Sequence, residues 1–164
     1  MNQGDVFTFL AADNRYKVII CTSIYKARSP HYCIFAALTY DNEEIPVIED
    51  AINSGFWGKA VYKGGNFKYP DSQIQCMWQY HPEIKPYYLG SYGLLIWRKD
   101  FLQFKDNMKF VGNLKIINDL DKNVNSSMNA SSWLTLQRFF NSEISKVLTY
   151  RSQKVFEVRS VLCQ

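Results

Sequence analysis

DVFTFLAADNRYKVIICTSIYKARSPHYCIFAALTY, residues 5–40, is the stretch that decides the fold. Asp5–Leu10 is an apolar-rich first strand, and Asp13-Asn14 is a turn signal that separates it from the next. Residues 15–24 are rich in Val, Ile and Thr, and residues 31–40 have a nearly continuous apolar centre. Three successive strands predict an antiparallel meander that curls into a small barrel or half-barrel.

The clearest helix of the sequence begins after Ser131 or Ser132, either of which can cap its first turn. Apolar side chains then recur at helical spacing, with Phe139 beside them. They are Trp133, Leu136, Phe140, Ile144, Val147 and Leu148. Residues 1–164 are therefore expected to form a single α+β domain. Its core would be a curled antiparallel sheet, or a partly open small β-barrel, with one C-terminal helix packed on it.

The remaining segments are predicted from shorter patterns. Residues 93–98 and 110–117 indicate two further strands, and residues 99–107 a turn or a short helical piece. Residues 118–129 form a polar loop rich in Asn, Asp and Ser. The tail, residues 153–162, is compatible with a strand or a helix, and its Val and Phe content favours the strand.

Composition places the chain among globular proteins, with 47% apolar and 21% charged residues. The net charge is +4, from 19 basic and 15 acidic residues, and no dense basic stripe is visible in the sequence. Binding to nucleic acid is therefore not expected from charge alone. The aromatic fraction of 16% is high, which favours a β-rich body and large contact areas.

Targeting and ligand-binding signals give a consistent set of expectations. The start, Met-Asn-Gln-Gly-Asp, has no basic and apolar leader, and the longest apolar runs are too short for a membrane span. We expect a cytoplasmic protein without a membrane partner. The four cysteines make no Cys-x-x-Cys pair and only two histidines exist, so we expect reduced thiols, no metal and no cofactor.

A catalytic constellation is not recognisable in the sequence. His31 and Cys33 are two residues apart on a predicted strand, so their side chains would share a face as a base and a nucleophile. Cys33 is nevertheless embedded in Ile34 and Phe35, which favours an inert core thiol. We expect a protein that binds a macromolecule and carries out no chemistry.

Two segments have the composition of recognition surfaces. Residues 41–50 carry five acids, which would repel one another in a core and so favour an exposed loop or edge. Residues 56–92 combine aromatic side chains with glycines and prolines, which predicts a loop-rich region with short strands. The expected partner-binding residues are the rim charges Glu43, Glu44, Glu49 and Asp50, and the anchors Trp78, Tyr80, His81, Tyr87 and Tyr88.

The opening residues resemble one known family. Gly4-Asp5-Val6-Phe7, followed by Asp13-Asn14-Arg15-Tyr16 and an apolar strand, is similar to the start of the immunity protein 26 family. Asn14 stands where that family has Gly, and both residues tolerate a left-handed turn. The resemblance covers about the first forty residues. It implies an immunity (antitoxin) protein that occludes a cognate bacterial toxin.

The same opening also resembles the MazF/PemK toxin barrel, which supplies the alternative prediction. Those ribonucleases carry a basic, Arg-rich loop after the first strand. Here Lys26, Ala27, Arg28 and Ser29 lie between the second and third predicted strands. That resemblance implies a ribonuclease or an RNA-binding domain in which Lys26 and Arg28 line a groove.

Overall fold

A computed structural model of the chain describes every residue except 28, 30, 63–68, 85–86, 124–125, 151 and 164. Side chains are further left undescribed at 61–62, 87–88, 122–123, 126, 147–148 and 150. Arg28 and the side chains of Tyr87 and Tyr88, to which the sequence assigned roles, therefore lie outside the described residues.

The three predicted N-terminal strands are confirmed. They are β1 (Asp5–Leu10), β2 (Tyr16–Tyr25) and β3 (Tyr32–Asn42), and they pair in antiparallel order. Asn14 adopts a left-handed φ of 59° in the first turn, where Arg15 N donates to Asp13 Oδ1 at 3.1 Å. The turn chemistry of Asp-Asn thus sets the first hairpin.

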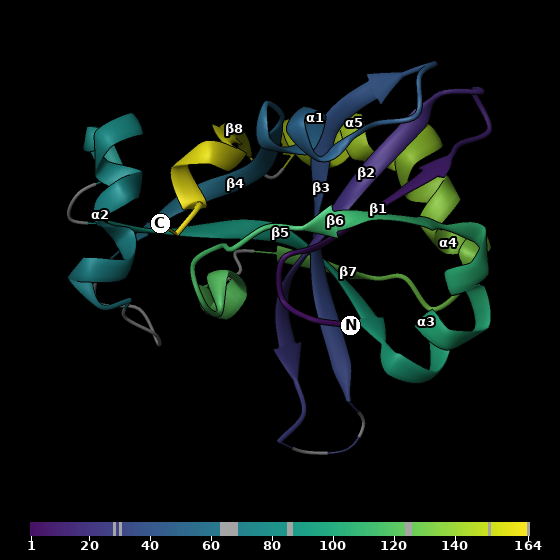
Figure 1. Cartoon of the computed structure of the whole chain (residues 1–164), viewed down its shortest axis with the longest axis horizontal. Helices are drawn as coiled ribbons and strands as arrows, with labels where there is room; N and C mark the ends of the chain where they lie inside the picture. The colour runs from purple at the N-terminus through teal and green to yellow at the C-terminus, as the bar shows by residue number, and fades with distance from the viewer. Residues whose placement is uncertain are drawn as a thin grey trace.

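β3 is the point at which the sheet forks and curls (Figure 1). Its first half pairs with β5 (Tyr87–Trp97), while Leu38 pairs with Phe56 in β4 (Gly55–Tyr62). β4 also pairs with β5 and with β8 (Lys154–Glu157). The result is the half-barrel expected from the sequence, within a mixed α+β fold.

Three strands differ from the predictions. β5, expected over residues 93–98, begins already at Tyr87 and ends at Trp97. β6 (Lys109–Asn113) is shorter than expected and pairs with β1 at an edge of the sheet. The predicted polar loop 118–129 contains a 3₁₀ turn (Leu120–Asn123) and β7 (Ser126–Asn129). β7 runs parallel to β5, so the sheet is not wholly antiparallel. Backbone pairing with a buried neighbour, rather than apolar content, makes this polar segment a strand.

The structure contains two further helices that we did not expect, and a third that matches the short helical piece predicted over residues 99–107. α1 (Ile48–Ile52) begins inside the acidic stretch, and α3 (Arg98–Phe104) follows β5 directly. α2 (Asp71–Tyr80) corrects the prediction of a loop-rich region, because Ile74 and Met77 give it a buried face. That face covers the end of the sheet away from α3 and α4 (Trp133–Arg138) (Figure 1).

The predicted C-terminal helix is confirmed with an interruption. Ser132 caps α4 by accepting a hydrogen bond from Thr135 N at 3.2 Å. A π-helical turn, Phe139–Glu143, then leads into α5 (Ile144–Tyr150). The wider turn allows the adjacent Phe139 and Phe140 both to be buried. The tail is a strand only to Glu157, after which Val158–Val161 form a 3₁₀ turn, η5.

The sheet is buried on both faces, because alternate residues of its central strands enter different core clusters. Val18, Ile20 and Ala36 belong to the cluster under α1 and α2, whereas Ile19 and Phe35 belong to the cluster under α3 and α4. Successive side chains of a strand point to opposite faces, so both faces carry an apolar layer. This explains the continuous apolar runs of residues 18–21 and 33–38.

Candidate functional site

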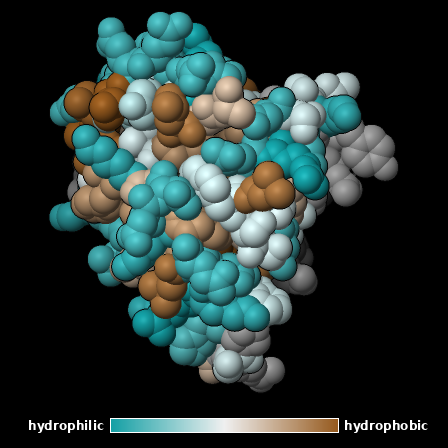
Figure 2. Space-filling view, turned by 90° about the vertical axis from the view of Figure 1, so that its right-hand side faces the viewer, coloured by the Kyte–Doolittle hydropathy of each residue, from teal (hydrophilic) through white to brown (hydrophobic). Residues whose placement is uncertain are grey.

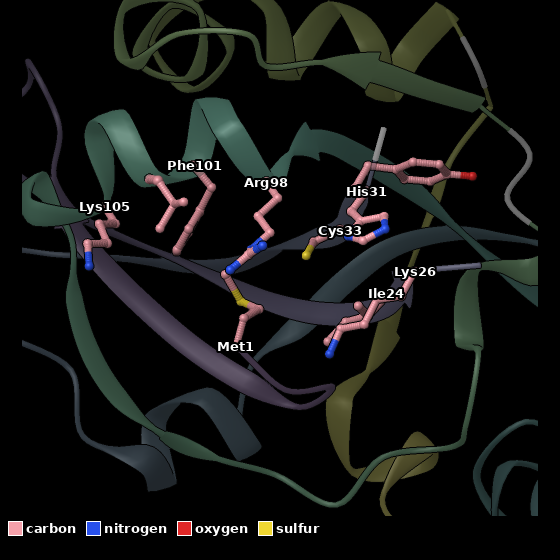
Figure 3. Close-up of a pocket in the computed structure, with 10 residues that line it drawn as sticks. Met1, Ile24, Lys26, His31, Cys33, Arg98, Phe101 and Lys105 are labelled. Carbon is pink, nitrogen blue, oxygen red and sulfur yellow. The ribbon is translucent and has the colours of Figure 1, made fainter. Parts of the chain in front are cut away.

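A pocket of about 490 Å³ opens beside the β2–β3 hairpin, against α3. Figure 3 shows Arg98, Lys26 and Lys105 around it, with the Cys33 side chain pointing into it. Apolar side chains supply the rest of the wall. The lining residues are Met1, Ile24, Lys26, His31, Tyr32, Cys33, Arg98, Phe101, Leu102 and Lys105.

Strand pairing explains why these residues meet. Tyr32 lies opposite Trp97 and Cys33 opposite Ile96, so the end of β5 is held against the start of β3. Arg98 N then donates to the His31 carbonyl at 2.9 Å, and α3 begins at this point. Arg98 and Leu102 are four residues apart on α3, so they share a face, and Lys105 follows three residues later in the 3₁₀ turn Lys105–Asn107, on the same side of the groove.

A second hollow of about 300 Å³ adjoins the first and shares His31, Arg98 and Leu102 with it. It adds Lys99, whose Nζ lies 4.9 Å from the centre of the Trp97 ring. We call the two hollows together the cationic groove, defined by Lys26, His31, Arg98, Lys99 and Lys105. No Asp or Glu is among the described residues that line it. Like charges gathered in a concave site create a positive potential that attracts anions.

One thiol, that of Cys33, lines the cationic groove, and a second, that of Cys21, lies behind it. Cys33 is 6% exposed and Cys21, on β2, is wholly buried in the same core cluster. Hydrogen bonding from the Cys21 thiol lowers the pKa of Cys33 against the opposing effect of burial, and the charges of Lys26 and Arg98 lower it further. The same contact, together with burial, raises the pKa of Cys21. No described hydrogen bond joins His31 to Cys33.

Aromatic rings flank the cationic groove. Tyr32 lines it and stacks on Tyr25 with ring centres 4.6 Å apart. Burial is the main cause that raises the pKa of Tyr25 to about 12, so its hydroxyl stays protonated at neutral pH. Tyr32 lies beside the positive charges with one ring face on Tyr25, and the Trp97 ring lies under Lys99 Nζ. An aromatic face in such a place can stack on a nucleobase.

The acidic stretch is exposed, as the sequence predicts, but its acids differ in how far they are buried and in their partners. Glu43, Glu44 and Glu49 are exposed, whereas Asp50 is half-buried and accepts a hydrogen bond from Val47 N at 2.9 Å. Ile45 and Val47 lie among these acids and are 51% and 57% exposed. Acids around two exposed aliphatic side chains make a small surface that can receive a protein partner.

Asp41, in the same stretch, is partnered by bases. Arg15 Nε lies 2.6 Å and Lys17 Nζ 2.8 Å from Asp41 Oδ1, and Lys17 also reaches Asp13 at 2.7 Å. The side-chain hydrogen bond from Lys17 is the main cause that lowers the pKa of Asp41. These contacts hold the end of the first hairpin to β3.

Two of the five predicted anchors, Trp78 and Tyr80, lie on α2, and His81 follows it. Trp78 is half-buried and Tyr80 is 49% exposed at the end of the helix. His81 is buried: its ring packs edge-on against Phe156, and its Nε2 pairs with Glu157. His81, which the sequence analysis names as a partner-binding residue, is therefore a buried side chain. α1 and α2 both pack against η5, so the acids and these aromatic residues flank the C-terminal segment.

Asp121 is a buried acid that the sequence analysis did not identify. Asp121 is 1% exposed, Ser91 Oγ donates to its Oδ1, and its Oδ2 has no partner among the described residues. Burial raises the pKa of Asp121 to about 7, although the hydrogen bond from Ser91 opposes the shift. Its backbone N donates to Ser23 Oγ at 3.3 Å, which ties the 3₁₀ turn to β2.

A cluster of metal ligands and a membrane-spanning helix are both absent from the described part of the chain. Its residues contain no group of three or more His, Cys, Asp and Glu able to hold a metal ion. None of its helices combines the length and apolar character that crossing a bilayer requires. Figure 2 shows separate hydrophobic patches on a mostly hydrophilic surface, so this face offers no large apolar docking area.

The fold and the site together define an α+β half-barrel with a cation-lined groove at one end of its sheet. No protein-family model, curated protein or solved structure matches the chain. The resemblances of the N-terminal residues to the immunity protein 26 family and to the MazF/PemK barrel therefore remain predictions.

Proposed function

We propose that this chain binds single-stranded RNA along the cationic groove and does not cleave it. The observation that carries the proposal is the gathering of Lys26, Arg98, Lys99 and Lys105 in one concave site without a lining acid among the described residues. Phosphate groups supply the complementary charge, and their neutralisation releases counterions.

Two further features favour a strand of nucleic acid over a small isolated anion. The two hollows adjoin, so the positive surface extends along α3 rather than surrounding one point. Tyr32 and Trp97 place rings next to the charges. Positive grooves with neighbouring aromatic rings are typical of proteins that bind single strands. The sequence predicts Lys26 in such a groove, as the alternative reading of the N-terminal resemblance.

Fluorescence anisotropy with a labelled oligouridine of about 12 nucleotides at low salt tests the proposal. Arg98→Ala and Lys105→Ala should each weaken binding by about tenfold, because each removes one charge-assisted contact. Each should also reduce the slope of log affinity against log salt by about 0.7.

Lys154→Ala is the matched control, because Lys154 is exposed on β8 and does not line the groove. Its affinity should equal that of the wild type. Absence of RNA affinity at low salt, or equal losses in all three variants, would rule out the groove as an RNA site. Shortening of the oligonucleotide during the measurement would contradict binding without cleavage.

The acidic surface supports a second candidate function, the immunity role implied by the first resemblance. Glu43, Glu44 and Glu49 are exposed in the same short segment as the exposed Ile45 and Val47, a combination of acids and aliphatic side chains that suits a charged rim around apolar anchors. A basic toxin would be captured faster through electrostatic steering and then occluded sterically. This candidate uses a different surface from the cationic groove.

Charge reversal at Glu43 and Glu44 tests the immunity role. The partner to use is the product of a toxin-module gene adjacent to the gene for this chain. The double change to Lys should slow association by about tenfold at low salt and much less at high salt, because salt screens steering. Asp106→Lys, at an exposed acid after α3, should leave the rate near that of the wild type. Equal rates in both variants at low salt would exclude this surface.

A further inference from the structure

The thiols of Cys21 and Cys33 occupy a setting that differs from that of the other two cysteines. Cys33 lines the cationic groove, and Cys21 lies behind it on the neighbouring strand in the same core cluster. Cys76 and Cys163 line a separate hollow near the C-terminus, where no Lys or Arg is among the described lining residues. All four cysteines are free thiols.

The register of β2 and β3 places Cys21 and Cys33 on neighbouring strands. Cys21 pairs with Phe35 and Ile24 pairs with Cys33, so the two cysteines lie diagonally across adjoining strands. Both side chains enter the same core cluster, so the two sulfurs lie on the same face of the sheet. The register shifts between Cys21 and Ser23, and such an irregularity increases local twist and bends the strand.

The surroundings of the two sulfurs shift the pKa values of Cys33 and Cys21 in opposite directions. The Cys21 hydrogen bond and the charges of Lys26 and Arg98 all lower the pKa of Cys33. The pKa values of Cys76 and Cys163 are raised by burial. Since the thiolate is the nucleophile, Cys33 is the sulfur with the greatest tendency to attack an electrophile that enters the groove.

We infer that Cys33 is an oxidation site for hydrogen peroxide or another small hydroperoxide, and that Cys21 is its resolving cysteine. The Cys33 thiolate attacks one peroxide oxygen, the O–O bond breaks, and the leaving hydroxide takes a proton from solvent to form water. The Cys21 sulfur then attacks the Cys33 sulfenic acid and its proton leaves with the hydroxyl as a second water. The two thiols lose two electrons, which reduce one peroxide to two waters.

The inference is independent of RNA binding, because it uses the sulfurs and the charge of the groove but no RNA contact. The full chain with Cys76→Ser and Cys163→Ser is treated with hydrogen peroxide under native conditions. Peptide mass mapping should find Cys21 joined to Cys33, with the loss of two hydrogens. In the wild type, Cys33 should react at least about tenfold faster than Cys76.

A second variant isolates the first step. In Cys21→Ala, which removes the resolving thiol, the Cys33 sulfenic acid should persist and be trapped by dimedone. Arg98→Ala should slow its formation several-fold, whereas Lys154→Ala should not. Cys33 reacting no faster than Cys76 would overturn the oxidation site. Formation of sulfenic acid without a Cys21–Cys33 disulfide in the parent would overturn the role of Cys21.

Discussion

Replacing Asp121 with Asn should raise the free energy of unfolding by about 4 kcal/mol at pH 8 and leave it nearly unchanged at pH 4. The pKa of the buried carboxyl is raised from 3.8 to about 7 in the folded chain. Folding therefore favours the neutral acid. That stabilisation is complete below about pH 4 and is lost as the pH rises through about 7. Asn keeps the shape of the neutral acid and removes the charge that must otherwise be buried.

Urea unfolding of the wild type and the variant, measured at several values between pH 4 and pH 8, checks this expectation. The difference between the two curves isolates Asp121 from other titrating groups. Asp106→Asn, at an exposed carboxyl, is the matched control and should track the wild type throughout. A difference between wild type and Asp121→Asn that does not change with pH would show that Asp121 is not the group responsible.

Gly4→Ala should destabilise the fold by at least about 3 kcal/mol. Gly4 has φ of +85°, and a Cβ built there would lie 1.8 Å from the Leu114 carbonyl oxygen. The obstacle is backbone that cannot rotate away, because Leu114 N donates to the Gly4 carbonyl at 2.9 Å and Gly4 N donates to the Cys21 carbonyl at 2.7 Å. The substitution must break at least one of these contacts.

Gly112→Ala provides the comparison, because Gly112 lies opposite Val6 in the β1–β6 pair, and Val6 comes just after Gly4 along the chain. A Cβ there would lie 2.9 Å from Ile48 Cδ1, the end of a flexible side chain that can adjust. Its cost should stay below about 1 kcal/mol. Thermal unfolding of the two variants side by side measures the contrast. Equal midpoints would show that the Gly4 backbone relaxes more easily than this geometry implies.

The N-terminal half of the sheet could be predicted from the sequence because its signals are local. Alternating and continuous apolar runs define β1 to β3, and Asp13-Asn14 defines the turn. α2 escaped prediction because its two buried residues, Ile74 and Met77, are dispersed among polar side chains. β7 escaped because its pairing with β5 depends on tertiary contact and not on apolar content.

The cationic groove was only partly predictable for a related reason. Lys26 belongs to a basic segment between two strands and was visible as a candidate. Arg98 and Lys105 are more than sixty residues away, and only the β3–β5 register places them beside His31. The available signal was the helical spacing of Arg98, Leu102 and Lys105 directly after an apolar strand. Asp121 gave no signal, since a buried acid in a polar segment looks like an ordinary loop residue.

Apolar layers on both faces of the sheet have a consequence for how its strands find their alignment. In a sheet with one solvent-exposed face, a shift of the pairing register by one residue moves the apolar side chains from the core to the solvent. The free-energy cost of exposing them fixes the register. β2 and β3 lack this safeguard, since residues of either parity are buried. Their alignment must depend on side-chain size and on the offsets between Lys17 and Ile19 and between Cys21 and Ser23. Those offsets can pair in only one register, whereas the apolar side chains of the two strands do not distinguish one register from the next.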